Sequence, residues 1–362
     1  MAIVTTPYIP TTITVHLGAP GQSAANVTVP FADYIKNVAS SEIYPTWEPS
    51  AIRANVLAQM SFALNRVYTG YYRSRGYDFD ITSTTAYDQK YIPDRNIFDN
   101  VAAVVDDVLG SYIRRRGFVE PLSAKFCNGT TTTCDGLSQW GSQSLAQQGY
   151  DSLDILRRYY GDDIELVTNA PVQQPRDSWP GRVLRRGDYG PDVLVVQTMV
   201  NRIAGDYPAI PRIWPPAAVF DGQTERAVQA FQRIFGLSPD GAVGKATWNK
   251  LVNLYNGVNQ LSELRSEGQR FTQVNFRYPG VVGPGARGEA VRALQYMLAM
   301  AAEYYQTLKP IPVDGVYGEA TRQAVEAFQQ AAGLSVDGIA GEQTWVELYR
   351  TFVRLERRSV GR

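Results

Sequence analysis

The most chemically suggestive residue in the sequence is Glu42, an acidic side chain on an otherwise apolar helical stripe. Phe31, Ile35, Val38 and Glu42 follow one another at steps of four, three and four residues, so they share one face of a helix. Because a buried carboxylate is costly in its charged form, we expect the pKa of Glu42 to rise. A carboxyl that keeps its proton near neutral pH can act as a general acid. The alternative is that Glu42 only caps a helix or forms an ion pair.

The helix that carries Glu42 should end directly after it. Pro45 lacks the backbone donor that a continuing helix needs. Glu42 would therefore lie at a helix end beside Tyr44 and Trp47, where a groove is easily built.

The neighbouring segments indicate what holds this helix in place. A second helix should open at Pro49 and run to about Tyr68, and it is apolar around much of its girth, so we expect it to be central and buried. Residues 12–17 alternate as a half-buried strand with His16 facing outward, and residues 27–29 form the returning strand.

A second motif, GLSQWG, occupies residues 136–141. The amide of Gln139 can donate to and accept from sugar hydroxyls, and Trp140 offers a flat apolar face to a pyranose ring. The alternative is a helix N-terminus whose tryptophan fills the core. Upstream, Cys127 and Cys134 are separated by six residues, which is compatible with a disulfide, two free thiols or part of a zinc site.

The order of these residues resembles the sporulation protein D family (SpoIID/LytB) over roughly residues 12–167. The resemblance is carried by DYIKNVASSEIYPTW, by FALNR at 62–66 and by GLSQWG. Members include peptidoglycan lytic transglycosylases. Within the family, the residues here are most similar to those of SleC-type spore cortex-lytic enzymes. The resemblance implies that Glu42 is the catalytic acid and that Arg53 is a basic substrate-binding position.

The same resemblance implies further substrate-binding residues. Gln89 and Tyr91 match the family's Cys/His-Gln-x-Tyr element, in which Asp88 replaces the usual first residue. Gln139 and Trp140 match its closing motif. We expect no metal and no cofactor.

Composition excludes some classes of function. Lys plus Arg and Asp plus Glu both number 35, so bulk charge does not favour a nucleic-acid partner. No stretch approaches the ~20 apolar residues of a membrane span. We see no secretory signal near Met1, and the export route is therefore open.

The C-terminal half contains an internal repeat. Ten residues recur 97 positions later, from Thr224 to Trp248 in the first copy and from Thr321 to Trp345 in the second. Each copy reads as a three-helix module and resembles the peptidoglycan-binding domain of the PG_binding_1 type. An alternative is a pair of generic helical modules for protein contacts.

We therefore predict an α+β catalytic domain at 1–170, all-α modules at 171–257 and 281–362, and a bridging segment at 258–280. The expected function is lytic transglycosylation of peptidoglycan strands in the spore cortex or cell wall. The expected product is a 1,6-anhydromuramic end from the bond between N-acetylmuramic acid (MurNAc) and N-acetylglucosamine (GlcNAc). The alternative is a non-catalytic role, either as an amidase enhancer working with other wall hydrolases or as a structural wall or spore protein.

Overall fold

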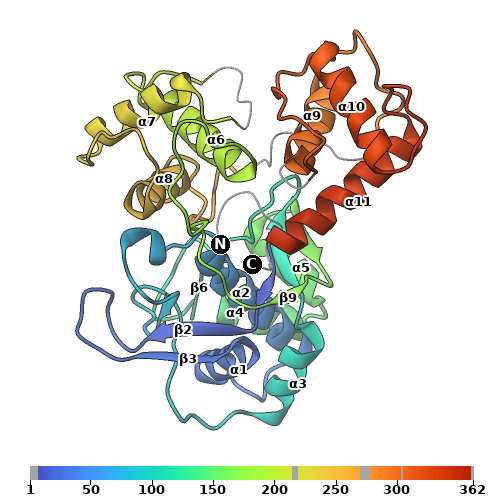
Figure 1. The fold of residues 1–362 in the computed structure, drawn as a ribbon. Helices are drawn as coiled ribbons and strands as arrows, with labels where there is room; N and C mark the ends of the chain where they lie inside the picture. The colour runs from blue at the N-terminus through green and yellow to red at the C-terminus, as the bar shows by residue number, and fades with distance from the viewer. Residues whose placement is uncertain (1–6, 214–218, 270–277, 303–304, 360–362) are drawn as a thin grey trace. The chain divides into compact units, whose positions relative to one another are not determined.

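A computed structural model describes residues 7–213, 219–269, 278–302 and 305–359 (Figure 1). It divides into two compact units. The N-terminal unit comprises the chain up to Ser178 together with Asn259–Gln269, and the C-terminal unit comprises Trp179–Val258 and the chain after Gln269. The first unit is mixed α+β and the second is helical, which confirms the predicted fold class. The domain boundaries given above remain predictions.

A small mixed sheet supports the helix that carries Glu42. β2 (Thr12–His16) pairs antiparallel with β3 (Asn26–Pro30) and parallel with β4 (Ile81–Thr82). His16 does not face solvent as predicted: it is buried, because Phe79 stacks on its ring at 4.6 Å and Asn26 Oδ1 lies 2.7 Å from its Nδ1. The His16 ring is covered by residues later in the chain, whereas Thr12 and Thr14 on the same face stay partly exposed.

Both predicted helices are confirmed. α1 spans Phe31–Glu42 and α2 spans Pro49–Tyr68. α2 is the central element of the N-terminal unit, since it contacts α1, α3 (Asp99–Val108), α4 (Gln139–Gln147) and α5 (Ser152–Tyr160). Its residues are buried around most of its circumference, as expected for a helix that is apolar on several faces.

Short strand pairs and one short 3₁₀ helix complete this unit. The pairs are β1 (Ile9–Pro10) with β9 (Val172–Gln173), β5 (Tyr112–Arg115) with β8 (Ile164–Val167), and β6 (Phe126–Cys127) with β7 (Leu137–Ser138). The 3₁₀ helix, η1, is Arg73–Arg75. Cys127 and Cys134 form a disulfide, which decides among the alternatives left open for this pair.

The helical unit contains the two repeats. The first carries α6 (Pro191–Asp206), α7 (Gly222–Ile234) and α8 (Lys245–Val258), and the second carries α9 (Glu289–Ala302), α10 (Glu319–Ala331) and α11 (Glu342–Ser359). Among the described residues, no helix combines the length and the apolar content that a bilayer crossing requires.

The residues shared by the repeats are structural. Gln232 donates to Asp240 Oδ1 at 2.8 Å and accepts from the backbone N–H of Gly241 at 2.9 Å. In the second repeat, Gln329 makes the same pair of contacts with Asp337 and Gly338, at 2.7 and 2.9 Å. Each buried glutamine thus fastens a tight Asp-Gly turn, and the recurrence reports a shared fold and does not identify a ligand.

Candidate functional site

The GLSQWG motif forms the start of α4, where neighbouring atoms pack closely around the backbone. Ser138 is the N-cap of α4, and its Oγ accepts from the backbone N–H of Gly141 at 2.9 Å. A Cβ on Gly141 would meet the Tyr159 hydroxyl at 2.0 Å, and one on Gly136 would meet the Lys125 carbonyl oxygen at 2.2 Å. Both glycines are therefore required by the close approach of neighbouring atoms.

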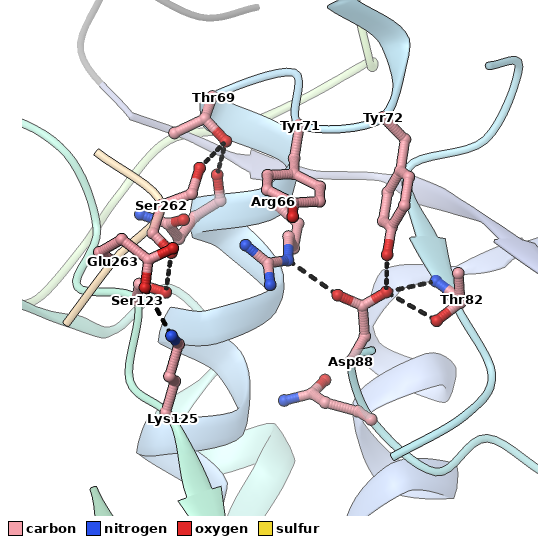
Figure 2. A network of polar contacts seen from close by, with 12 residues as sticks. Arg66, Thr69, Tyr71, Tyr72, Thr82, Asp88, Ser123, Lys125, Ser262 and Glu263 are labelled. Atoms are coloured by element: carbon pink, nitrogen blue, oxygen red, sulfur yellow. Dashed lines mark hydrogen bonds and ion pairs between the residues drawn. The ribbon is translucent and has the colours of Figure 1, made fainter. Parts of the chain in front are cut away.

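The run from Asp88 to Lys90 is held equally firmly. The Asp88 carboxylate is fully buried and accepts from Arg66 Nε at 2.8 Å and from the Tyr72 hydroxyl at 2.6 Å, and Thr82 donates to it from both its backbone and its hydroxyl (Figure 2). This explains how an aspartate can occupy the position where the SpoIID/LytB resemblance expects Cys or His: a buried charge is tolerated when it is paired and hydrogen-bonded.

Gln89 is also buried, and both ends of its amide are engaged within the protein. Its Nε2 donates to the Gln59 carbonyl at 2.9 Å, and its Oε1 accepts from the Tyr34 hydroxyl at 3.0 Å. The substrate-binding role of Gln89 stays a prediction, and the amide that would make such a contact is already engaged at both ends within the protein. Its geometry suits a positioning role.

The Glu42 carboxyl accepts one hydrogen bond from each of these two segments. The backbone N–H of Lys90 donates to Oε1 at 2.9 Å, and Gln139 Nε2 donates to Oε2 at 3.3 Å. Burial raises the pKa of Glu42 above its ordinary value, and these two hydrogen bonds oppose the rise without cancelling it. Glu42 as a residue is only partly buried, so it combines a tendency to hold a proton with some exposure to solvent.

Gln139 and Lys90 therefore have roles that the sequence did not reveal. Gln139 is buried and bonds to the Glu42 carboxyl, although the motif had suggested a sugar contact. The backbone of Lys90 was not predicted at all, since a main-chain donor leaves no mark in residue type. The sequence feature that could have indicated it is the Gln-x-Tyr element, because Lys90 lies between Gln89 and Tyr91.

The segments around Glu42 and Gln139 also form an aromatic cluster, defined here as Tyr44, Trp47 and Trp140. Trp140 lies 5.0 Å from Trp47 and 5.7 Å from Tyr44 between ring centroids. Trp47 is buried, whereas Tyr44 is 56% and Trp140 44% exposed. Tyr44 follows Glu42 by two residues and Trp140 follows Gln139 directly, so the exposed rings come from the same two segments as Glu42 and its partner Gln139. Of these three, only Trp140 was predicted as a site residue.

The turn that carries Tyr44 and Trp47 is fastened from two other elements. Gln143 of α4 accepts from the backbone N–H of Glu48 at 2.9 Å, and Asn100 donates to the Pro45 carbonyl at 2.7 Å. The disulfide loop supports the remaining ring, because the Asn128 carbonyl accepts from the Trp140 backbone N–H at 3.2 Å. The cluster is thus positioned by three separate parts of the chain.

The other two predicted site residues, Arg53 and Tyr91, make their contacts with other parts of the protein. Arg53 pairs with Asp107 of α3, and both side chains are exposed. Tyr91 stacks on the buried Tyr34 at 5.7 Å, and burial raises its pKa. Neither makes a contact with Glu42 or Gln139 that would mark it as part of the acid's surroundings, and their substrate-binding roles remain predictions.

Family comparisons agree with this layout. The Stage II sporulation protein (SpoIID) family matches residues 21–113, which include Glu42, and the PG_binding_1 family of peptidoglycan binding domains matches residues 189–251 and 287–348. The chain carries a SpoIID domain followed by two PG_binding_1 domains. Gln139 and Trp140 lie outside the SpoIID match.

Individual relatives are more distant. An N-acetylmuramoyl-L-alanine amidase, CwlL of Bacillus licheniformis, is 27% identical over 177 residues, which is 47% of this chain and 45% of the amidase. The chain therefore matches less than half of that protein's length. The crystal structure of the SleB N-terminal domain matches at 40% identity over 20% of this chain and 92% of the other, with a TM-score of 0.17.

Proposed function

We propose that this protein is a peptidoglycan lytic transglycosylase of the spore cortex-lytic type, with Glu42 as its acid and base. The observation that supports this most directly is a carboxyl of raised pKa held by two N–H donors, on segments that also carry two exposed aromatic rings. This is the constellation expected for a general acid at a sugar-binding surface.

One carboxyl suffices for the proposed reaction. Protonated Glu42 gives its proton to the glycosidic oxygen as the bond from MurNAc C1 breaks, and GlcNAc leaves with a new 4-hydroxyl. The Glu42 carboxylate then takes the proton of the MurNAc 6-hydroxyl as that oxygen attacks C1 and closes the 1,6-anhydro ring. Because an internal hydroxyl replaces water, the second carboxylate of a hydrolytic glycosidase has no task here.

In this proposal the repeats hold the enzyme on an insoluble polymer. Two binding domains on one chain convert the second binding event into an intramolecular one, so residence on the wall increases without any new contact at the acid. Spore cortex and vegetative wall both present the glycan strands that such domains would bind.

Product analysis tests the proposal. Purified wall is incubated with the wild-type chain or with Glu42→Gln, and the products are separated and weighed by mass spectrometry. The proposal expects anhydromuropeptides from the wild type and none from the variant. New reducing ends would indicate a hydrolase, and released stem peptides would indicate the amidase activity named for the Bacillus relative. No release with normal sedimentation on wall would favour a binding role.

A further inference from the structure

Eleven residues from between the two repeats belong physically to the N-terminal unit. Asn259–Gln269, called the strap here, follows α8 in the chain but is grouped with residues up to Ser178. It contains no helix or strand, so regular secondary structure does not explain its placement. Its side chains and backbone have to be satisfied by the surface on which it lies.

The first half of the strap is fastened to the end of α2 and to the segment around Ser123. The Leu261 carbonyl accepts from Asn65 Nδ2 at 2.8 Å in a buried setting. The Ser262 carbonyl accepts from the Ser123 hydroxyl at 2.9 Å (Figure 2). The Leu261 side chain is 1% exposed. An exposed ion pair, Lys125 with Glu263, lies at the edge of this contact.

The second half is fastened by a buried carboxylate. Glu120 is 3% exposed, and its two oxygens accept from the Ser266 hydroxyl at 2.8 Å and from the Gln269 backbone N–H at 2.9 Å. The Gln269 carbonyl accepts in turn from the Val119 N–H at 3.1 Å, and the Gln269 side chain accepts from the Tyr68 hydroxyl at 2.8 Å. A buried carboxylate whose lone pairs are taken by one segment ties that segment down, because its removal would leave the carboxylate unpaired.

Gly268 shows that backbone and surface fit closely. It has a φ of +81°, and a Cβ added to it would meet the Phe118 ring at 2.4 Å. Any other residue would be strained by its backbone conformation and would also collide with the ring. Leu264 contributes to the hydrophobic core of the N-terminal unit. Apolar burial, hydrogen bonds and close packing therefore all mark the strap as an integral part of that unit.

We infer that the first PG_binding_1 domain is an insertion in the N-terminal unit. The strap is then a docked segment, and it stays bound to the N-terminal unit when the chain before the inserted domain is cut. Residues 179–258 leave the N-terminal unit after Ser178 and return to it at Asn259. The surface that receives the strap is formed by α2 and by residues 115–125, and its partner is this chain's own strap. This inference does not depend on the proposed activity.

Nicking the full-length chain tests it. A specific protease sequence is inserted between Gln174 and Pro175, which are both exposed, and the purified protein is cleaved and passed over a size-exclusion column. The two fragments should elute as one species in native buffer and as two in denaturant. Separation of the wild-type fragments in native buffer would overturn the inference.

Strap variants in the nicked protein identify the contact. Leu261→Asp and Gly268→Val should each separate the fragments, because both changes lie in the strap and leave the receiving surface intact. Arg265→Ser is the matched control on the same segment: its side chain is 83% exposed, and the fragments should stay together. Continued co-elution of both disruptive variants would show that something other than the strap holds the fragments.

Hydrogen exchange on the uncut wild type gives a second, independent measurement should the variants not fold. The amides of Val119 and Gln269 should exchange slowly, as buried and hydrogen-bonded groups do. Fast exchange at both amides would contradict a docked strap.

Discussion

Two glutamates of the N-terminal unit have pKa values shifted in the same direction but lie in opposite surroundings. Burial raises the pKa of both Glu42 and Glu120, and hydrogen bonds from backbone and side chains oppose the rise in each case. Glu120 is covered by the strap and has both oxygens satisfied by it. Glu42 is only partly buried, and the segments that carry it and its partner Gln139 also carry the exposed rings of Tyr44 and Trp140.

This difference shows that a raised pKa does not by itself mark a site of chemistry. Desolvation makes a carboxyl hold its proton wherever it is buried. What separates the two glutamates is exposure: Glu42 is partly exposed, whereas both oxygens of Glu120 are bonded to the strap. Asp88 is a third case, in which an ion pair with Arg66 stabilises a fully buried carboxylate. Each carboxylate can be tested by a different measurement.

The largest expected effect is on catalysis at Glu42. Under the proposed mechanism, Glu42→Gln should lower the transglycosylation rate by about 10²–10⁴-fold, the usual contribution of a general acid or base. The wild-type rate should also fall as pH rises through the raised pKa of Glu42, because the proton needed for the first step is then lost. Initial rates of anhydromuropeptide release across pH measure both. Glu48→Gln, an exposed neighbour, should leave the profile unchanged.

The next largest effect should come from Asp88. Asp88→Ala leaves Arg66 buried without its partner, which should cost about 3–5 kcal/mol of stability in the N-terminal unit. Asp107→Ala breaks the exposed pair with Arg53 and should cost only about 0–1 kcal/mol. Urea-dependent hydrogen exchange of the α2 amides measures both losses. Equal losses would show that burial of the Arg66–Asp88 pair has no energetic consequence.

Glu120 should matter for stability and not for chemistry. Glu120→Ala leaves the Gln269 N–H and the Ser266 hydroxyl without their acceptor, which should cost about 1–3 kcal/mol. Thermal unfolding of the N-terminal unit measures the loss. The rate per folded molecule at permissive temperature should stay at the wild-type level, and a rate loss as large as that of Glu42→Gln would remove the distinction between the two glutamates.

A smaller effect is expected at the exposed rings. Trp140→Ala removes one apolar face beside Glu42 and should raise KM for soluble glycan strands about tenfold, which corresponds to about 1.4 kcal/mol. Tyr150→Ala is a matched control, since Tyr150 is 45% exposed and Trp140 44%. Steady-state kinetics on strands of defined length separates KM from the turnover rate. Equal effects of the two variants would remove Trp140 from the proposed sugar-binding surface.

Local sequence patterns were sufficient for the elements that carry the acid. Periodicity and two prolines gave the bounds of α1 and α2, and the recurrence at 97 residues gave the second helical repeat. These features depend on residues a few positions apart or on one unit copied whole. The raised pKa of Glu42 was also predictable, because it follows from an acidic residue on an apolar stripe.

Contacts between distant parts of the chain could not be predicted in this way. Asn65 and Leu261 are 196 residues apart, and nothing in either local pattern announces the pairing. The same applies to Gln139, whose motif suggested a sugar ligand although its amide reaches Glu42 across 97 residues. The internal contacts of Gln89 were not predictable either, because residue type reveals hydrogen-bonding capacity but not whether the protein itself uses it.

The smallest expected effect is on stability. It separates the energetic cost of keeping an ionisable carboxyl at Glu42 from the proposed catalytic role of that carboxyl. Its folded-state pKa is raised, so the folded protein binds this proton more tightly than the unfolded chain does. The resulting stability is fully present below the unfolded pKa of about 4.3 and is lost as pH rises through the folded pKa. Glu42→Gln, which cannot ionise, should therefore unfold at a higher temperature than the wild type above that pKa. The difference should shrink toward acid pH, while Glu48→Gln follows the wild type. Thermal unfolding from acid to neutral pH measures this, and a variant less stable at neutral pH would mean that the charged carboxylate is better accommodated than its surroundings indicate.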